Sequence, residues 1–269
     1  MERTLRADAF SGQTHIVTGA GQGIGRAVAA ALAIHGASVA MVDLDAGRVA
    51  EGAREIAKET GSEPLVIGAN VAVEAEVQRA VARALEWNGS LNGVVNVAGI
   101  TRDARIVKKS LADFRMVLEV HLIGTFLFTR EIAAQHWHEL FKQGGNQPLR
   151  DGANRSIVNF SSVSARNGNV GQVDYTAAKG GIESLTKTAA REFASYGARV
   201  NAIAPGPVRT PMLAAVGDAG IALMSAATLV GRVAEPEDIA ATVAAITDGR
   251  LFGYTTGQVF AANGGMYLD

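Results

Sequence analysis

Cysteine is absent from the 269 residues, so the chain can form neither a disulfide nor a thiolate metal site, which fits a reducing compartment. There is also no excess of charge of one sign. The 25 Lys and Arg residues and 26 Asp and Glu residues leave a net charge of -1, which offers no attraction to nucleic acid or an anionic membrane. No apolar run approaches the roughly 18 residues that a membrane span needs, and Met1–Ser11 lacks the apolar core of a secretory signal. We therefore expect a cytoplasmic protein without nucleic-acid or membrane partners.

Apolar residues make up 48% of the chain, enough for a sizeable core, and they fall into two alternating patterns. Short runs rich in Val, Ile and Ala predict strands, and longer segments of helical period separate them. Alternation of this kind is typical of a parallel sheet with helices on both faces. The predicted strands are 15–18, 38–43, 64–69, 93–96, 156–160, 199–203 and 258–261, and the predicted helices are 23–35, 47–60, 74–87, 111–141, 173–196 and 236–247.

Neither a repeat nor a linker divides the sequence, so we expect one catalytic domain over residues 1–269. Residues 142–155 are rich in Gly and Asn and predict a surface insertion between a helix and the fifth strand.

A glycine-rich turn connects the first predicted strand to the first predicted helix, in the segment Thr18-Gly19-Ala20-Gly21-Gln22-Gly23-Ile24-Gly25. Glycines allow a tight turn and bring backbone N–H groups close to a ligand, and the helix N-terminus favours negative charge. Glycine-rich turns also occur without a ligand. The strand before and the helix after indicate a site for the pyrophosphate of a dinucleotide.

An acidic residue, Asp43, ends the second predicted strand, 18 residues beyond Gly25. At this spacing a carboxylate accepts hydrogen bonds from the adenosine ribose and repels a 2′-phosphate. Gln22 also lacks the charge to pair with such a phosphate. Both residues favour NAD (NADH) over NADP, although Asp43 alone would also fit a solvated strand end, and Asp45 is a competing acid.

Tyr175 and Lys179 are four residues apart and lie on one face of a predicted helix. Hydride transfer to a ketone leaves an alkoxide that needs a proton, and a phenol can supply it if a nearby ammonium lowers the phenol pKa. This spacing is common by chance. Small neighbours on both sides, Ala177, Ala178, Gly180 and Gly181, would let a cofactor approach closely.

Three serines, Ser161, Ser162 and Ser164, follow the fifth predicted strand at the carboxyl end of the sheet. A hydroxyl there could bind the substrate oxygen and stabilise its developing charge. These residues alone do not single out one serine.

In order and spacing, these motifs resemble the short-chain dehydrogenase/reductases over nearly the whole chain, and in particular their β-ketoacyl reductase-like and 17β-hydroxysteroid dehydrogenase-like branch. Residues 18–25 resemble the TGxxxGxG turn, 96–99 the NNAG segment with Val97 in place of Asn, 175–179 the YxxxK motif and 205–210 the PG stretch. Residues 98–103, 231–238 and 256–258 resemble the β-ketoacyl reductase-like branch. Ser162 is 13 residues before Tyr175, as the family's catalytic serine is.

The resemblance implies a single doubly wound Rossmann-type α/β domain with a seven-stranded parallel sheet, usually in a homotetramer. It implies that Tyr175 is the general acid/base, that Lys179 binds ribose and lowers the tyrosine pKa, and that Ser162 orients the carbonyl. The cofactor-binding residues that we expect, besides Tyr175 and Lys179, are Gly19, Gln22, Gly23, Ile24, Gly25, Asp43, Leu44, Asn70, Val71, Asn96, Ala98, Gly99, Pro205, Gly206, Val208 and Thr210.

Two positions depart from the family pattern. His121 stands where the family usually has an Asn that helps to hold a water between the lysine and solvent, and we expect histidine to substitute for it as a catalytic residue. Asn70 stands where Asp more often contacts the adenine, and its amide can retain that contact.

The segment 208–230 is expected to be a substrate lid, and its mainly apolar residues favour a hydrophobic secondary alcohol or ketone. A 3-oxoacyl thioester of coenzyme A or a carrier protein, and a hydroxysteroid, remain alternatives. Tyr196 stands where carrier-protein reductases tend to have a basic residue, and this difference weakens a role in fatty-acid synthesis. A dinucleotide-binding regulator without catalysis is the alternative from another class. We expect no metal, because His121, His136 and His138 do not have the spacing of a zinc motif.

Overall fold

The computed structural model describes residues 4–214 and 216–268. Its centre is a seven-stranded sheet in the order β3-β2-β1-β4-β5-β6-β7, in which every neighbouring pair is parallel. The strands are β1 (Thr14–Thr18), β2 (Ser38–Asp43), β3 (Leu65–Gly68), β4 (Gly93–Asn96), β5 (Arg155–Phe160), β6 (Ala198–Pro205) and β7 (Val259–Ala262). The predicted doubly wound Rossmann-type fold is confirmed.

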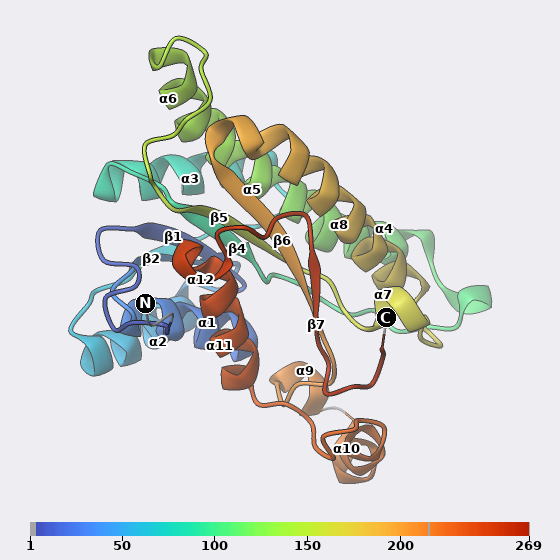
Figure 1. The fold of residues 1–269 in the computed structure, drawn as a ribbon. Helices are drawn as coiled ribbons and strands as arrows, with labels where there is room; N and C mark the ends of the chain where they lie inside the picture. Colours follow the sequence, from blue (N-terminus) through green and yellow to red (C-terminus); the bar gives the residue numbers. More distant parts are fainter. Residues whose placement is uncertain (1–3, 215, 269) are drawn as a thin grey trace.

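Helices cover both faces of the sheet, in two layers that Figure 1 shows on opposite sides of the strands. One layer contains α1 (Gly23–Ile34), α2 (Ala46–Thr60), α11 (Pro236–Thr247) and α12 (Gly249–Phe252). The other contains α3 (Glu74–Asn88), α4 (Leu111–Leu118), α5 (Gly124–Ile132) and α8 (Val173–Glu192). Adjacent strand residues alternate between the two cores. Ile16 packs into the α3/α5 core and Val17 into the α1/α11 core, as the period of two in a strand requires.

The predicted helix 111–141 is helical throughout, and two of its turns are π-helical rather than α-helical. After α4 comes η2 (Glu119–Ile123), and after α5 comes η3 (Ala133–Trp137), which leads into α6 (His138–Gln143). Single π-turns within α-helices are frequent at functional sites. Here the first one contains His121.

Side chains cap the starts of two helices. The Ser110 hydroxyl accepts a hydrogen bond from the N–H of Asp113 at the start of α4. The Asp238 carboxylate accepts one from the N–H of Glu235 before Pro236 opens α11. Both contacts satisfy backbone donors that a helix end would otherwise leave without partners.

Five short elements were not predicted: η1 (Ile106–Lys108), α7 (Ser164–Asn167), α9 (Pro211–Ala214), α10 (Gly217–Ala226) and α12, while η4 (Phe193–Tyr196) forms the end of the predicted helix 173–196. Helices α9 and α10 fall in the predicted lid, and Figure 1 shows them standing apart from the two helical layers. In the insertion 142–155, most residues are exposed. Among the described residues, no helix is long and apolar enough to span a membrane.

Candidate active site

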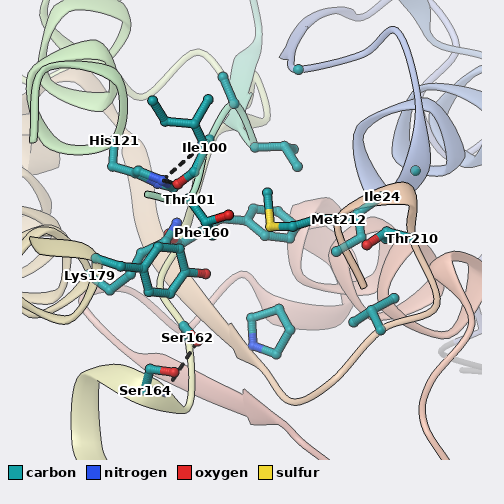
Figure 2. Close-up of a pocket in the computed structure, with 18 of the residues that line it drawn as sticks. Ile24, Ile100, Thr101, His121, Phe160, Ser162, Ser164, Lys179, Thr210 and Met212 are labelled. Carbon is teal, nitrogen blue, oxygen red and sulfur yellow. Dashed lines mark hydrogen bonds between the residues drawn. The ribbon is translucent and has the colours of Figure 1, made fainter. Parts of the chain in front are cut away.

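A cavity of about 790 Å³ lies at the carboxyl ends of the central strands, where the strand order reverses between β1 and β4. Ligands of open α/β sheets bind at this switch point. The glycine turn and Asp43 line one part of the cavity, and Ser162, Tyr175 and Lys179 line another. Figure 2 shows His121, Lys179 and Ser162 in one half of the view, with Ile24 and Thr210 in the other.

Backbone packing in the glycine turn leaves no room for side chains. A Cβ atom on Gly19 would lie 2.8 Å from the Ala98 Cα, and one on Gly25 would lie 2.1 Å from the Gly19 carbonyl oxygen. Helix α1 then starts at Gly23 without a side-chain cap and without an acidic residue in its first turn. Its first N–H groups therefore remain available at the cavity wall, and this arrangement fits the pyrophosphate of a dinucleotide.

Asp43 is fixed at the end of β2 by two backbone donors. One carboxylate oxygen accepts from the Gly21 N–H at 3.0 Å and the other from the Asp45 N–H at 3.2 Å. Arg48 lies near this carboxylate, since a Cβ atom on Gly21 would be 3.1 Å from the Asp43 Oδ2 and 3.2 Å from the Arg48 Cβ. The Arg48 guanidinium donates to the Gln22 Oε1 at 3.1 Å and pairs with Asp45 at 3.1 Å. The Asp43 carboxylate can accept hydrogen bonds from ribose hydroxyls, and the Arg48 guanidinium is a cation close to it.

Tyr175, Lys179 and Ser162 meet in the same part of the cavity. The Lys179 Nζ lies 5.4 Å from the centre of the Tyr175 ring and donates to the Phe160 carbonyl at 2.6 Å. The Ser162 hydroxyl lies close enough to the Tyr175 phenol to lower the pKa of that phenol. It also accepts from the Ser164 N–H at 3.2 Å (Figure 2).

The structure separates the three candidate serines by their partners. The Ser161 hydroxyl is turned away from the phenol and donates to Glu183 at 2.9 Å, and the Ser164 hydroxyl donates to Gln172 at 3.5 Å. Of the three, Ser162 is the one whose side chain acts on the pKa of Tyr175.

Burial dominates the protonation of this group. It raises the pKa of the Tyr175 phenol, the hydrogen bond from Ser162 lowers it, and the charge of Asp103 raises it further. Burial also lowers the pKa of Lys179 to about 7. The expected lowering of the tyrosine pKa by lysine is therefore opposed, in the protein alone, by removal of both groups from water.

His121 lies against Tyr175, with the two rings edge to face and their centres 5.1 Å apart. Its Nε2 is 2.8 Å from the Ile100 carbonyl oxygen and 3.0 Å from the Ile100 N–H nitrogen, a contact drawn in Figure 2. The other ring nitrogen, Nδ1, is buried without a hydrogen-bond partner among the described residues. Burial and the charge of Lys179 lower the pKa of His121 to about 3, so the ring is neutral at ordinary pH.

Nearly all the predicted cofactor-binding residues line the cavity, and Asn96 is the exception. Its side chain is buried below the cavity and donates to Asn159 at 2.9 Å and Thr129 at 3.3 Å. Asn70 does reach the cavity, with its Oδ1 accepting from the Ala72 N–H, so its amide nitrogen is the group left for a base.

The segment 208–230 contributes apolar side chains to the cavity, namely Val208, Pro211, Met212, Leu213, Val216 and Met224. Leu223, Leu229 and Val230 from the same segment do not line the cavity and are exposed, and Met212 and Val216 are themselves partly exposed to solvent.

Sequence reasoning assigned no role to several residues that line the substrate side of the cavity. Asp103 belongs to the 98–103 motif, and Gln172 is three residues before Tyr175, so both were visible as neighbours of known motifs. Met266 was not, because it comes from the far end of the chain.

Comparison with known proteins gives the family. The family model described as Enoyl-(Acyl carrier protein) reductase matches residues 19–267. The chain belongs to the short-chain dehydrogenase/reductases. It is 34% identical to the 3-oxoacyl-[acyl-carrier-protein] reductase of Synechocystis, over 97% of this chain and 99% of that protein. It is 36% identical to the (3R)-3-hydroxyacyl-CoA dehydrogenase of Mus musculus, over 94% and 95%.

Among solved structures, the fold is similar to that of a proposed gluconate dehydrogenase from Agrobacterium tumefaciens. The TM-score is 0.85 at 30% identity, and the match covers 97% of this chain and 98% of that one. The chain is thus an oxidoreductase of a family that binds a nicotinamide dinucleotide and acts on alcohol and ketone groups.

Proposed function

We propose that this protein is an NAD(H)-dependent oxidoreductase that interconverts a hydrophobic secondary alcohol and its ketone. The observation that carries the proposal is that Ser162, Tyr175 and Lys179 line the same cavity as the uncapped start of α1 and Asp43. A dinucleotide and a carbonyl compound can thus meet beside one buried phenol.

In the reducing direction, the Ser162 hydroxyl would donate a hydrogen bond to the substrate carbonyl and hold it beside the phenol. The bound dinucleotide supplies the hydride for the carbonyl carbon. Tyr175 gives its proton to the oxygen as negative charge develops there, and Lys179, 5.4 Å from the ring centre, stabilises the phenolate left behind. In the oxidising direction, the phenolate accepts the proton of the alcohol.

Asp43 supports NAD over NADP, because its carboxylate is fixed by the Gly21 and Asp45 N–H groups where the adenosine ribose is expected. The apolar lid residues Met212, Leu213, Val216 and Met224 support a hydrophobic substrate. Relatives named as 3-oxoacyl-carrier-protein reductases and hydroxyacyl-CoA dehydrogenases favour a second candidate, a 3-oxoacyl thioester.

The test is the absorbance of reduced nicotinamide during incubation with a panel of ketones and alcohols, with NADH and NADPH in parallel. We expect turnover with NADH that a Tyr175→Phe variant loses by at least a hundredfold, while its dissociation constant for NADH stays within a few fold. Tight cofactor binding by the parent with no turnover of any compound would instead favour a regulator.

We also propose that the protein is a homotetramer. Large apolar side chains are exposed together on α4, the following π-turn and α5, namely Leu111, Met116, Ile123 and Phe126. Several exposed large apolar side chains on one helical segment support an interface there. Sedimentation analysis should give four copies, and Phe126→Asp should reduce that number.

A further inference from the structure

Charge is distributed unevenly around the substrate side of the cavity. Among the described residues that line it, the carboxylate of Asp103 and the buried amine of Lys179 are the charged groups near Tyr175, and no arginine is present. An anionic substrate would therefore find no guanidinium with which to pair. It would also meet the Asp103 charge.

Asp103 is an exposed residue, and its carboxylate accepts hydrogen bonds from the Gln172 side chain. The Gln172 Nε2 lies 3.2 Å and 3.4 Å from its two oxygens. On one side of Asp103, the Ala104 N–H donates to the Gly171 carbonyl at 2.9 Å. On the other side, the Lys109 ammonium donates to the Arg102 carbonyl. Both neighbours of Asp103 are thus fixed to other parts of the structure.

Hydrogen bonds along this wall point in one direction. The Asn169 amide and the Ser164 hydroxyl both donate to the Gln172 Oε1, at 3.0 Å and 3.5 Å, and the Gln172 amide donates to Asp103. The series ends in the carboxylate, for which no Lys, Arg or His of the described chain forms a salt bridge. Asp103 lines the cavity and is exposed, so its remaining lone pairs are open to water or to a ligand.

We infer that Asp103 is a specificity-determining residue, which makes the cavity select uncharged carbonyl compounds carrying a hydroxyl or amide N–H and reject carboxylates. The inference rests on the proposed oxidoreductase function and narrows its substrate class. Apolar parts of such a substrate would contact Met212 and Met224 of the lid. Its polar hydrogen would donate to Asp103.

The same charge acts on the phenol. Asp103 is one of the causes that raise the pKa of Tyr175, which places its charge within electrostatic reach of the reacting atoms. The other titratable groups around the phenol are His121, Lys179 and the Asp174–Lys109 ion pair. Neutralising Asp103 should therefore affect both substrate choice and the protonation of Tyr175.

The experiment compares reduction of three related probes by NADH: the anion 3-oxobutanoate, its ethyl ester, and its N-acetylcysteamine thioester, which carries an amide N–H. Each gains one hydride and one proton to give the 3-hydroxy product. In the parent, we expect kcat/KM for the anion to be at least tenfold below that for the ester, and the thioester to be the best of the three. Asp103→Asn should raise the value for the anion about tenfold and change that for the ester less than threefold, and added salt should shrink the difference.

Glu119→Gln is the matched control, because it removes the same charge from an exposed residue that does not line the cavity. It should leave the ratio of anion to ester unchanged. A parent that reduces the anion as well as the ester, or an Asp103→Asn variant with the parent's ratio, overturns the inference and leaves the proposed function standing. Failure to reduce any carbonyl compound, with NADH bound, overturns the proposed function instead.

A titration of phenolate absorbance needs no substrate and gives a second readout. The chain has 4 tyrosines, so subtraction of a Tyr175→Phe curve isolates the active-site phenol. Asp103→Asn should lower the pKa of Tyr175, and Glu119→Gln should not. An unchanged Tyr175 curve in Asp103→Asn would overturn the electrostatic basis of the inference even if the enzyme reduced none of the probes.

Discussion

The imidazole of His121 occupies the space that a side chain at position 99 would need. A Cβ atom on Gly99 would lie 2.3 Å from the His121 Cε1 and 3.0 Å from its Nδ1. The two residues are 22 positions apart in the sequence and come from different elements, the β4–α4 loop and the π-turn. The histidine that replaces the family's usual Asn is therefore accommodated by a glycine across the site.

This contact predicts a strong coupling between positions 99 and 121. In the parent, Gly99→Ala should lower the free energy of unfolding by about 1–3 kcal/mol, because the ring must leave its place beside Tyr175. In a His121→Asn background the same change should cost less than half as much, since the smaller amide leaves room. Urea unfolding of the four proteins measures the coupling, and equal costs in the two backgrounds would show that the ring moves freely.

His121→Asn alone should retain much of the activity, because an amide can also bond to the Ile100 backbone as Nε2 does. His121→Ala should lose more, with a changed pH–rate profile, if the ring supports proton movement to Lys179. An alanine variant with the parent's rate at every pH would exclude that role.

The fold could be predicted from sequence because strands with apolar runs and helices with a period of 3.6 differ over many residues. Predicted β2 and β4 match the observed bounds, and α11 does as well. The short helices α7, α9 and α10 escaped prediction, since four to ten residues give too little periodicity to recognise. The π-turn at His121 is set by packing rather than by a local pattern.

For the candidate site, motif spacing predicted that Tyr175, Lys179 and Ser162 lie close together. It did not predict the contacts that distinguish one residue from another. Choosing among the three serines required the hydrogen bonds of Ser161 to Glu183 and of Ser164 to Gln172, and the proximity of Ser162 to Tyr175. The neighbourhood of Asp103 depends on Gln172, 69 residues away. No local sequence pattern carries a contact of that range.

Asp174, the residue directly before the candidate general acid/base Tyr175, forms a buried ion pair with Lys109. The Lys109 ammonium is 2.7 Å from the Asp174 carboxylate, and the two side chains are 4% and 1% exposed. Lys109→Met should destabilise the protein by about 3–5 kcal/mol, because it leaves a buried carboxylate unpaired. Adding Asp174→Asn should restore most of that loss, since the amide removes the charge and can still accept from the Tyr175 N–H.

Thermal and urea unfolding of the two single variants and the double variant test this ion pair. Lys108→Met, a change of the exposed neighbouring lysine, is the control and should have little effect. A double variant as unstable as Lys109→Met would mean that packing of the lysine chain, and not its charge, stabilises this region.

Cofactor choice should depend on Asp43 and Arg48 together. Asp43→Ser removes the carboxylate that would repel a 2′-phosphate, and Arg48 is 56% exposed in its ion pair with Asp45, so releasing it costs little. We expect affinity for 2′-phospho-ADP-ribose to rise at least tenfold in Asp43→Ser and affinity for ADP-ribose to fall. Calorimetric titration measures both constants without turnover.

Adding Arg48→Met to Asp43→Ser should abolish the gain, because the guanidinium is the cation beside that carboxylate. Arg54→Met, on the same helix α2, serves as the control. Tight binding of 2′-phospho-ADP-ribose by the Asp43→Ser/Arg48→Met protein would mean that a group other than Arg48 binds the 2′-phosphate.

Stability should fall in mild acid because of His15. This ring is fully buried in β1, its Nε2 lies 3.2 Å from the Gln13 Oε1, and burial with the charge of Arg199 lowers its pKa from 6.5 to about 4. Between these two pH values the unfolded chain binds a proton that the folded protein does not, so the free energy of unfolding decreases as pH falls from 6.5 to 4. The shift corresponds to about 3 kcal/mol at the lower limit.

Urea unfolding at steps between pH 7 and 4 should show a steep slope in the parent and a shallower one in His15→Gln. The slope that remains would come partly from His121, whose pKa is also lowered. His35→Gln, at a half-buried position, is the control, and if His15→Gln kept the parent's full slope, the acid sensitivity would have to arise elsewhere.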